Sequence, residues 1–191
     1  MSAIRKLAAG LALIGGALIM VSAILISIDV ATRLVWGRIY LNSFELSRLM
    51  FAVAVALSLA YAAVERTHIR IDLAIKGWSA PVRAGAGVLA YLALALMGFY
   101  LAMRGSDLFL HSWRINARPV ANVPVRLWVP QGAWLVGLVA FAGVSVVIAL
   151  AAVRHAIAGR WSEAEALVGT PSVSEEIETS GPSLPGRGAD A

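Results

Sequence analysis

Residues 7–28 read LAAGLALIGGALIMVSAILISI, and this stretch contains no Asp, Glu, Lys, Arg or His. A helix needs about 20 consecutive apolar residues to cross the hydrocarbon of a bilayer, so the stretch predicts a membrane-spanning helix. Arg5 and Lys6 precede it, and residues 21–23 (VSA) resemble a signal-peptide cleavage site. The apolar core of a signal peptide is shorter, about 7 to 15 residues. We therefore expect an uncleaved first span.

Three further long apolar stretches predict spans over 46–64, 84–103 and 127–153. The whole chain is 60% hydrophobic and 14% charged, with a mean hydropathy of +0.80. Soluble domains are roughly half apolar and about a quarter charged. The sequence thus predicts an all-α integral membrane protein with four transmembrane helices joined by short amphipathic interfacial segments.

The C-terminal part of the chain has a different composition. Residues 162–191 are rich in Ser, Pro, Gly and Glu, and six acids against Arg187 give this segment a charge of −5. The net charge of the chain is +5, so residues 1–161 carry +10. Such a composition cannot bury a core. We expect a transmembrane domain over 1–161, with its basic surface at phospholipid head groups rather than nucleic acid, and a disordered acidic cytoplasmic tail over 162–191.

The number of predicted spans and the distribution of basic residues suggest an orientation. Four spans place both termini on one side; within residues 1–161 that side has 8 Lys and Arg residues and the other side has 7. Basic residues favour the cytoplasmic side of a membrane. The difference slightly favours cytoplasmic termini in a multi-pass membrane protein.

The predicted spans lack the side chains that usually carry transport chemistry. Transporters that couple an ion to a substrate show buried charges or broken helices at mid-membrane, and these spans contain neither. An independent small transporter and the membrane anchor of a redox enzyme remain as alternatives. Paired histidines at equal depth could ligate a haem in a membrane anchor, but the three histidines, His68, His111 and His155, all lie at span ends. We therefore predict no cofactor, no metal site and no enzymatic activity.

Small residues recur at four-residue spacing within the spans, which permits close helix packing. They are Ala54, Ser58 and Ala62, with Ala52, Ala56 and Ala60 on another face of the second span, Ala12 and Gly16 in the first span, and Ala133 and Gly137 in the fourth. The pattern predicts packing within the chain or against a partner subunit.

The connection after the first span mixes charges with aromatic residues. Asp29 and Arg33 are four residues apart, so on a continuing helix they face each other. Gly37 is expected to permit the turn. Asn42 or Ser43 is expected to cap the second helix, with Glu45 in its first turn. The close placement of Arg33, Arg38, Glu45 and Arg48 suits an interfacial segment or a docking surface.

The segment ERTHIRIDL (65–73) follows the second span directly. His68 and Asp72, like Arg66 and Arg70, are four residues apart, and Ile69 and Leu73 lie on an apolar face. This pattern predicts a short amphipathic element on the membrane surface.

Four blocks together resemble one known family. They are DVATRLVWGR (29–38), FELSRLMF (44–51), ERTHIRIDL (65–73) and VPQGAWLVG (129–137). In this order, over roughly 15–152, they are similar to the small membrane subunit (DctQ-type) of tripartite ATP-independent periplasmic (TRAP) transporters. The tail lies outside the resemblance.

The resemblance implies four tilted helices, cytoplasmic termini and a scaffold role in the import of organic acids such as dicarboxylates with sodium. It implies a large membrane subunit (DctM-type) as a separate chain and a periplasmic solute-binding protein as partners. The residues that match the family's motifs are expected to serve interfacial structure and subunit contact, not chemistry. They are Asp29, Arg33, Gly37, Glu45, Arg48, His68, Arg70, Asp72, Pro130 and Gly132.

Overall fold

The structure is a computed structural model that describes residues 2–37, 42–65, 79–119 and 125–168. These residues form five helices and no strand. The helices are α1 (Ser2–Trp36), α2 (Ser43–Val64), α4 (Ala80–Arg114), α5 (Trp128–Ile157) and α6 (Trp161–Val168). Four of them are long and apolar enough to cross a membrane. The predicted all-α membrane fold is confirmed.

The long helices extend beyond the predicted spans. α1 and α4 each contain 35 residues. The predicted third span ends at residue 103, but α4 continues to Arg114. Its charged side chains in this part stay exposed, while Gly105 and Ser112 are buried. The helix continues because one face still packs on α5.

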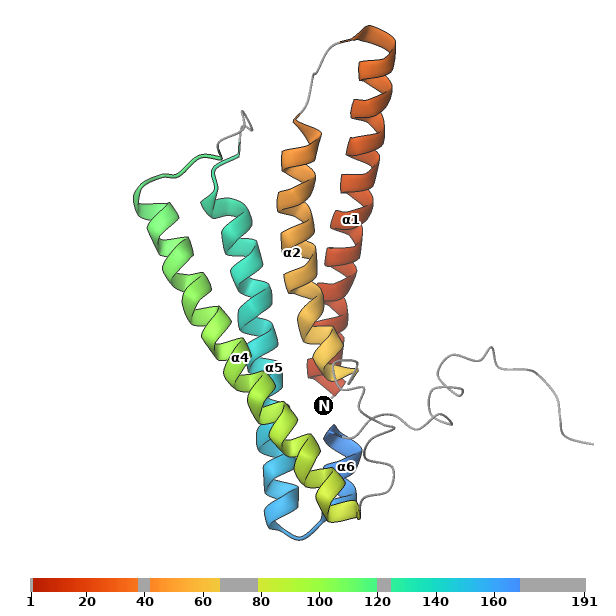
Figure 1. Cartoon of the computed structure of the whole chain (residues 1–191), viewed down its shortest axis with the longest axis vertical. Coiled ribbons are helices and arrows are strands. Elements are labelled where there is room, and N and C mark those ends of the chain that lie inside the picture. Colours follow the sequence, from red (N-terminus) through yellow and green to blue (C-terminus); the bar gives the residue numbers. More distant parts are fainter. Residues whose placement is uncertain (1, 38–41, 66–78, 120–124, 169–191) are drawn as a thin grey trace, which may run out of the picture.

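The four long helices stand in a row rather than a closed bundle. α1 packs on α2, α2 on α5, and α5 on α4. Figure 1 shows this order in the upper part of the view, and lower down α4 crosses α5. α1 and α4 are therefore the two edges of the row. The α1–α2 hairpin extends further at one end, and the α4–α5 hairpin extends further at the other end, where the N-terminus and α6 lie (Figure 1). We call the end with the N-terminus and α6 the terminal end and the opposite one the far end.

Each edge helix uses a single buried seam with a spacing of seven residues. The buried residues of α1 are Ala8, Gly15, Ser22 and Asp29. In α4 the seam comprises Ala84, Tyr91, Gly98, Gly105 and Ser112, and Ala95, one turn after Tyr91, is buried as well. A seven-residue spacing keeps one face of a helix against a slightly inclined neighbour. Most of the seam residues are small, which lets the backbones approach closely.

Two glycines show how close the helices come. A Cβ atom on Gly15 would lie 2.8 Å from the carbonyl oxygen of Ala54 in α2, and one on Gly137 in α5 would lie 2.5 Å from the carbonyl carbon of Ala56. The predicted packing faces of α2 and the contact at Gly137 are thus used within the chain. In the first span the contact with α2 is made by Gly15; Gly16 is exposed, and a Cβ there would meet nothing within 4 Å of this chain.

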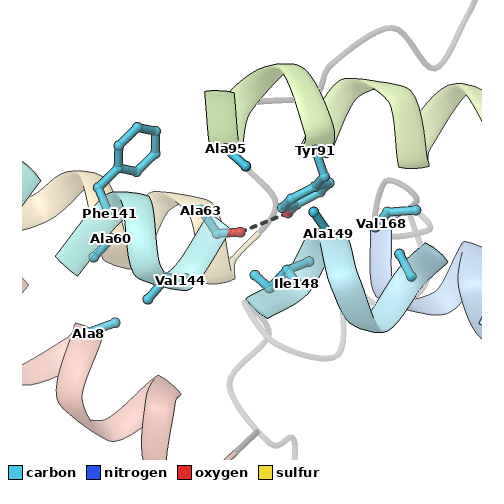
Figure 2. Close-up of a cluster of buried hydrophobic side chains, with 11 residues drawn as sticks. Ala8, Ala60, Ala63, Tyr91, Ala95, Phe141, Val144, Ile148, Ala149 and Val168 are labelled. Atoms are coloured by element: carbon cyan, nitrogen blue, oxygen red, sulfur yellow. Dashed lines mark hydrogen bonds between the residues drawn. The ribbon is translucent and has the colours of Figure 1, made fainter. Parts of the chain in front are cut away.

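The buried cluster that joins the two hairpins lies toward the terminal end (Figure 2). Tyr91 of α4 is 1% exposed. Its hydroxyl donates a hydrogen bond to the carbonyl oxygen of Ala63, in the last turn of α2, at 2.8 Å. An unpaired carbonyl at a helix end is costly to bury, so Tyr91 both fills the core and satisfies the end of a neighbouring helix.

The beginning of the tail differs from the sequence-based expectation. Residues 162–168 belong to α6, which packs on α4 and α5. Ala164 and Val168 are both 0% exposed, and a Cβ on Gly87 of α4 would lie 2.7 Å from Val168 Cγ2. Composition averaged over 162–191 concealed this short apolar face. Residues 169–191 lie outside the described residues.

Candidate functional site

Asp29 is the centre of a polar cluster at the far end of the α1–α2 seam. It is 2% exposed. Its Oδ2 accepts hydrogen bonds from Arg33 Nη2 at 2.7 Å and from Ser43 Oγ at 2.5 Å. The expected pairing of Asp29 with Arg33 is therefore present. Ser43 was expected as a helix cap, but its hydroxyl instead links α2 to α1. The cluster fixes the two helices at the end of their contact.

The turn between α1 and α2 begins as the sequence predicts. Gly37 follows the last residue of α1 with a φ of +64°, a conformation that glycine adopts without strain. Its amide donates to the Arg33 carbonyl at 2.9 Å. Asn42 is the N-cap residue of α2, but its side chain makes no capping hydrogen bond. Glu45 lies in the first turn of α2, where a negative charge is favoured.

Arg48 is the exposed member of this region. Its Nη2 lies 2.6 Å from Glu45 Oε1, one turn away, and the side chain of Arg48 is 67% exposed. An ion pair this exposed contributes little to stability. Arg48 is therefore available for a contact outside the chain without loss of the fold.

Pro130 and Gly132 lie in the first turns of α5. Proline is tolerated there because its missing N–H has no helical acceptor. A Cβ on Gly132 would lie 3.1 Å from Phe109 Cε2 of α4, so this glycine allows the ring to pack. Trp113 and Trp128 meet edge to face beside them, with ring centroids 4.5 Å apart. Gly132 thus permits α4–α5 packing at the far end, and Pro130 lies where the start of α5 accommodates it.

Three of the expected site residues, His68, Arg70 and Asp72, lie outside the described residues. The structure brings Asp29, Arg33, Gly37, Glu45 and Arg48 to the α1–α2 connection. It places Pro130 and Gly132 at the α4–α5 connection. The motif residues therefore form two groups, both at the far end.

Two ion pairs at the terminal end were missed from the sequence. Arg5 of α1 and Glu65, which follows α2, lie 2.9 Å apart (Nε to Oε1). Arg83 of α4 and Glu165 of α6 lie 2.7 Å apart (Nε to Oε1), with a second contact at 3.3 Å. The partners are 60 and 82 residues apart in sequence, so no local spacing reveals them. Each pair ties a helix end to its neighbour.

The two described histidines lie far apart in the structure. His111 is near the far end of α4 and His155 near the terminal end of α5, so they lie at opposite ends of the pair and cannot share one iron. His68 is not among the described residues. Within the described ranges, no three His, Cys, Asp or Glu side chains form a group that could hold a metal ion.

The comparisons with known proteins give one match. The family model described as "Tripartite ATP-independent periplasmic transporters, DctQ component" matches residues 22–158. The match begins within α1 and ends just after α5, so it includes all or part of each long helix. No curated protein and no solved structure matches the chain.

Proposed function

This chain belongs to the DctQ component family of tripartite ATP-independent periplasmic transporters, and on that premise we propose that it is a scaffold subunit for organic-acid import. The imported acids include dicarboxylates, and sodium drives their uptake. The large membrane subunit (DctM-type) carries the substrate and sodium sites, and a periplasmic solute-binding protein delivers the substrate. The protein lies in the bacterial inner membrane with both termini in the cytoplasm, and it is not an enzyme.

The observation that carries this proposal is the family match over 22–158. The spans support a scaffold role, because the stretches 7–28, 49–64, 84–103 and 127–153 contain no ionisable side chain other than Tyr61, Tyr91 and Tyr100. Coupling an ion to a substrate within the membrane generally uses such groups. A subunit without carboxylates or cations in its spans fits a supporting role beside a subunit that has them.

We further propose that the motif residues serve interfacial structure and subunit contact. Asp29, Arg33 and Gly37 shape the α1–α2 connection, and Pro130 and Gly132 shape the α4–α5 connection. Glu45 and the exposed Arg48, together with His68, Arg70 and Asp72, contact the partner subunit or the membrane surface.

Co-purification from native membranes tests the proposal. A tagged form of this chain is expected to bring down a large membrane subunit, and cells lacking the chain are expected to lose sodium-dependent uptake of an organic acid. Absence of any such subunit from the purified material contradicts the scaffold role. Accumulation of substrate by liposomes that contain this chain alone contradicts it as well.

Arg48→Glu tests the contact role, with Arg160→Glu as the matched control. Each arginine is exposed, 67% for Arg48 and 58% for Arg160, and each has a glutamate partner three residues away. Arg48→Glu is expected to reduce recovery of the large subunit and the rate of uptake, whereas Arg160→Glu leaves both near normal. Equal effects of the two variants rule out a specific role for Arg48. Asp72→Lys is expected to act like Arg48→Glu.

A further inference from the structure

The first two turns of α4 form a helix that their own sequence supports poorly. Gly85 and Gly87 fall in the second turn, and glycine is among the least favourable residues inside a helix. Ser79 is the N-cap residue, but its side chain makes no capping hydrogen bond, and the first turn contains no acidic residue. It contains Arg83 instead, and a positive charge is unfavourable at the N-terminus of a helix. Residues 80–87 therefore depend on contacts from outside α4.

The helix α6 supplies such contacts. The three atoms nearest to a Cβ built on Gly87 all belong to Val168, and the closest lies at 2.7 Å. Glu165 provides the acid that the first turn lacks, because its two carboxylate oxygens lie 2.7 and 3.3 Å from guanidinium nitrogens of Arg83. Figure 1 shows the start of α4 next to α6, below the point where α4 crosses α5. α6 thus covers the weak start of α4 and offsets its unfavourable charge.

α6 depends on the same contacts for its own stability. It has eight residues, and isolated helices shorter than about 12 residues are marginal in water. Residues 158–160 join it to the end of α5, and the amide of Arg160 in this turn donates to the carbonyl oxygen of His155 at 3.0 Å. The end of α6 reaches α4, where Val168 is 0% exposed. Two weak helices that stabilise each other open and close together as one local unit.

We propose that α6 is a strap that switches residues 80–87 between helix and connection. With α6 docked, α4 begins at Ala80. When α6 separates, the helix begins after Gly87, and the residues before that point are added to the chain that links α2 to α4. These residues span about 12 Å as a helix and up to about 26 Å when extended. Docking of α6 therefore sets the reach of the link.

This switch connects the C-terminal part of the chain to the sequence motif that precedes α4. His68, Arg70 and Asp72 lie in the link between α2 and α4. The docked strap holds the end of this link at Ala80, and separation of the strap moves the end to Gly87. α6 thereby controls how far the motif can extend from the helices. The switch follows from the contacts between α4 and α6 and does not rest on the proposed transport role.

Hydrogen exchange of the full chain in lipid nanodiscs tests the coupling. Amides 84–91 donate to the carbonyls of 80–87 in an α-helix, so their protection reports the first two turns. Val168→Asp is expected to remove protection from α6 and to speed exchange of amides 84–91 by about tenfold or more, because it removes a buried apolar side chain. Residues 134–150 of α5 are expected to stay protected. Ala166→Asp adds the same charge at an exposed position of α6 and is expected to change neither helix.

Two outcomes of this experiment overturn the proposal. If amides 84–91 exchange at the original rate once α6 has lost protection, the start of α4 does not depend on the strap. If exchange rises throughout α5 as well, α6 is part of the core and not a separate switch.

A rescue variant separates the switch from a general loss of folding. Gly85→Ala favours the helix by itself, because alanine is the best helix former and a Cβ at this position meets nothing within 4 Å. In the Val168→Asp background, Gly85→Ala is expected to restore protection of amides 84–91 while α6 stays unprotected. Tryptic cleavage after Arg83 gives a second readout, expected to be faster in Val168→Asp and slow again with Gly85→Ala. Failure of Gly85→Ala to restore protection and slow cleavage overturns the proposal.

Discussion

At the scale of single residues, Asp29 shows how a buried charge is accommodated where two membrane helices end their contact. An isolated carboxylate is costly to bury, but Asp29 accepts hydrogen bonds from Arg33 and Ser43. Arg33 is 46% exposed, so the pair reaches toward the membrane surface. Asp29 thereby links a helix end to its neighbour without leaving a cation buried.

Asp29→Asn is expected to lower the thermal stability of the purified protein. The substitution keeps the size of the side chain and removes the charge that strengthens both hydrogen bonds, each worth about 1.5–3 kcal/mol when charged. Melting in detergent measures the change. Asp107→Asn is the control, because Asp107 is 69% exposed and 3.8 Å from Arg104. An equal loss in both variants would contradict the role given to the α1–α2 cluster.

Gly15 and Gly16 provide a second test at this scale. A Cβ at position 15 would lie 2.8 Å from a backbone oxygen of α2, whereas one at position 16 meets nothing within 4 Å. Gly15→Ala is expected to destabilise the hairpin by about 1–3 kcal/mol, as overpacking typically does. Gly16→Ala is expected to cause no loss. The same melting measurement compares the two, and a larger loss for Gly16→Ala would show that the seam is wrongly placed.

At the scale of elements, α6 shows that a short helix can be held by tertiary contacts alone. Eight residues are too few for a stable isolated helix. Val168 packs against Gly87, and Glu165 makes two contacts with Arg83. Both contacts are with α4, so α6 secures the start of that helix at the terminal end of the row.

Two deletions are expected to separate α6 from the rest of the tail. Removing residues 161–191 eliminates the contacts of α6 and is expected to lower the melting temperature. Removing only 169–191 retains those contacts and is expected to leave the melting temperature and uptake near normal. If both deletions lower the melting temperature equally, the described contacts of α6 contribute nothing to stability.

At the scale of the whole molecule, the two hairpins meet in one buried cluster that includes Tyr91. The Tyr91 hydroxyl crosses from α4 to the end of α2, although these helices are not neighbours in the row. Packing between the two hairpins in this buried cluster sets the order α1, α2, α5, α4.

Tyr91→Phe is expected to weaken the joint while preserving its packing. Loss of one hydrogen bond costs about 1 kcal/mol. Limited proteolysis and thermal melting are expected to show earlier separation of the hairpins. Tyr61→Phe, at a half-buried position in α2, is the control. Earlier separation in Tyr61→Phe than in Tyr91→Phe would argue against a tie through Tyr91.

The sequence alone predicts the fold class because hydrophobic length is a local property, readable in stretches such as 7–28. It also predicts the Asp29–Arg33 pair and the turn at Gly37, which depend on neighbours within four residues. It did not predict the row, the Arg5–Glu65 and Arg83–Glu165 pairs or α6. Those features depend on which helices become neighbours, and residues far apart in the chain decide this.

The seven-residue seams of the edge helices restrict insertions and deletions in α1 and α4 during evolution. Adding or deleting one residue within α1 or α4 turns everything beyond it by about 100°, since a helix has 3.6 residues per turn. Ser22 and Asp29, for example, would swing away from α2 after an insertion near Gly15. We therefore expect homologous sequences to differ in the lengths of the connections. The edge helices are expected to keep their lengths, even at positions where nearly any apolar substitution is accepted.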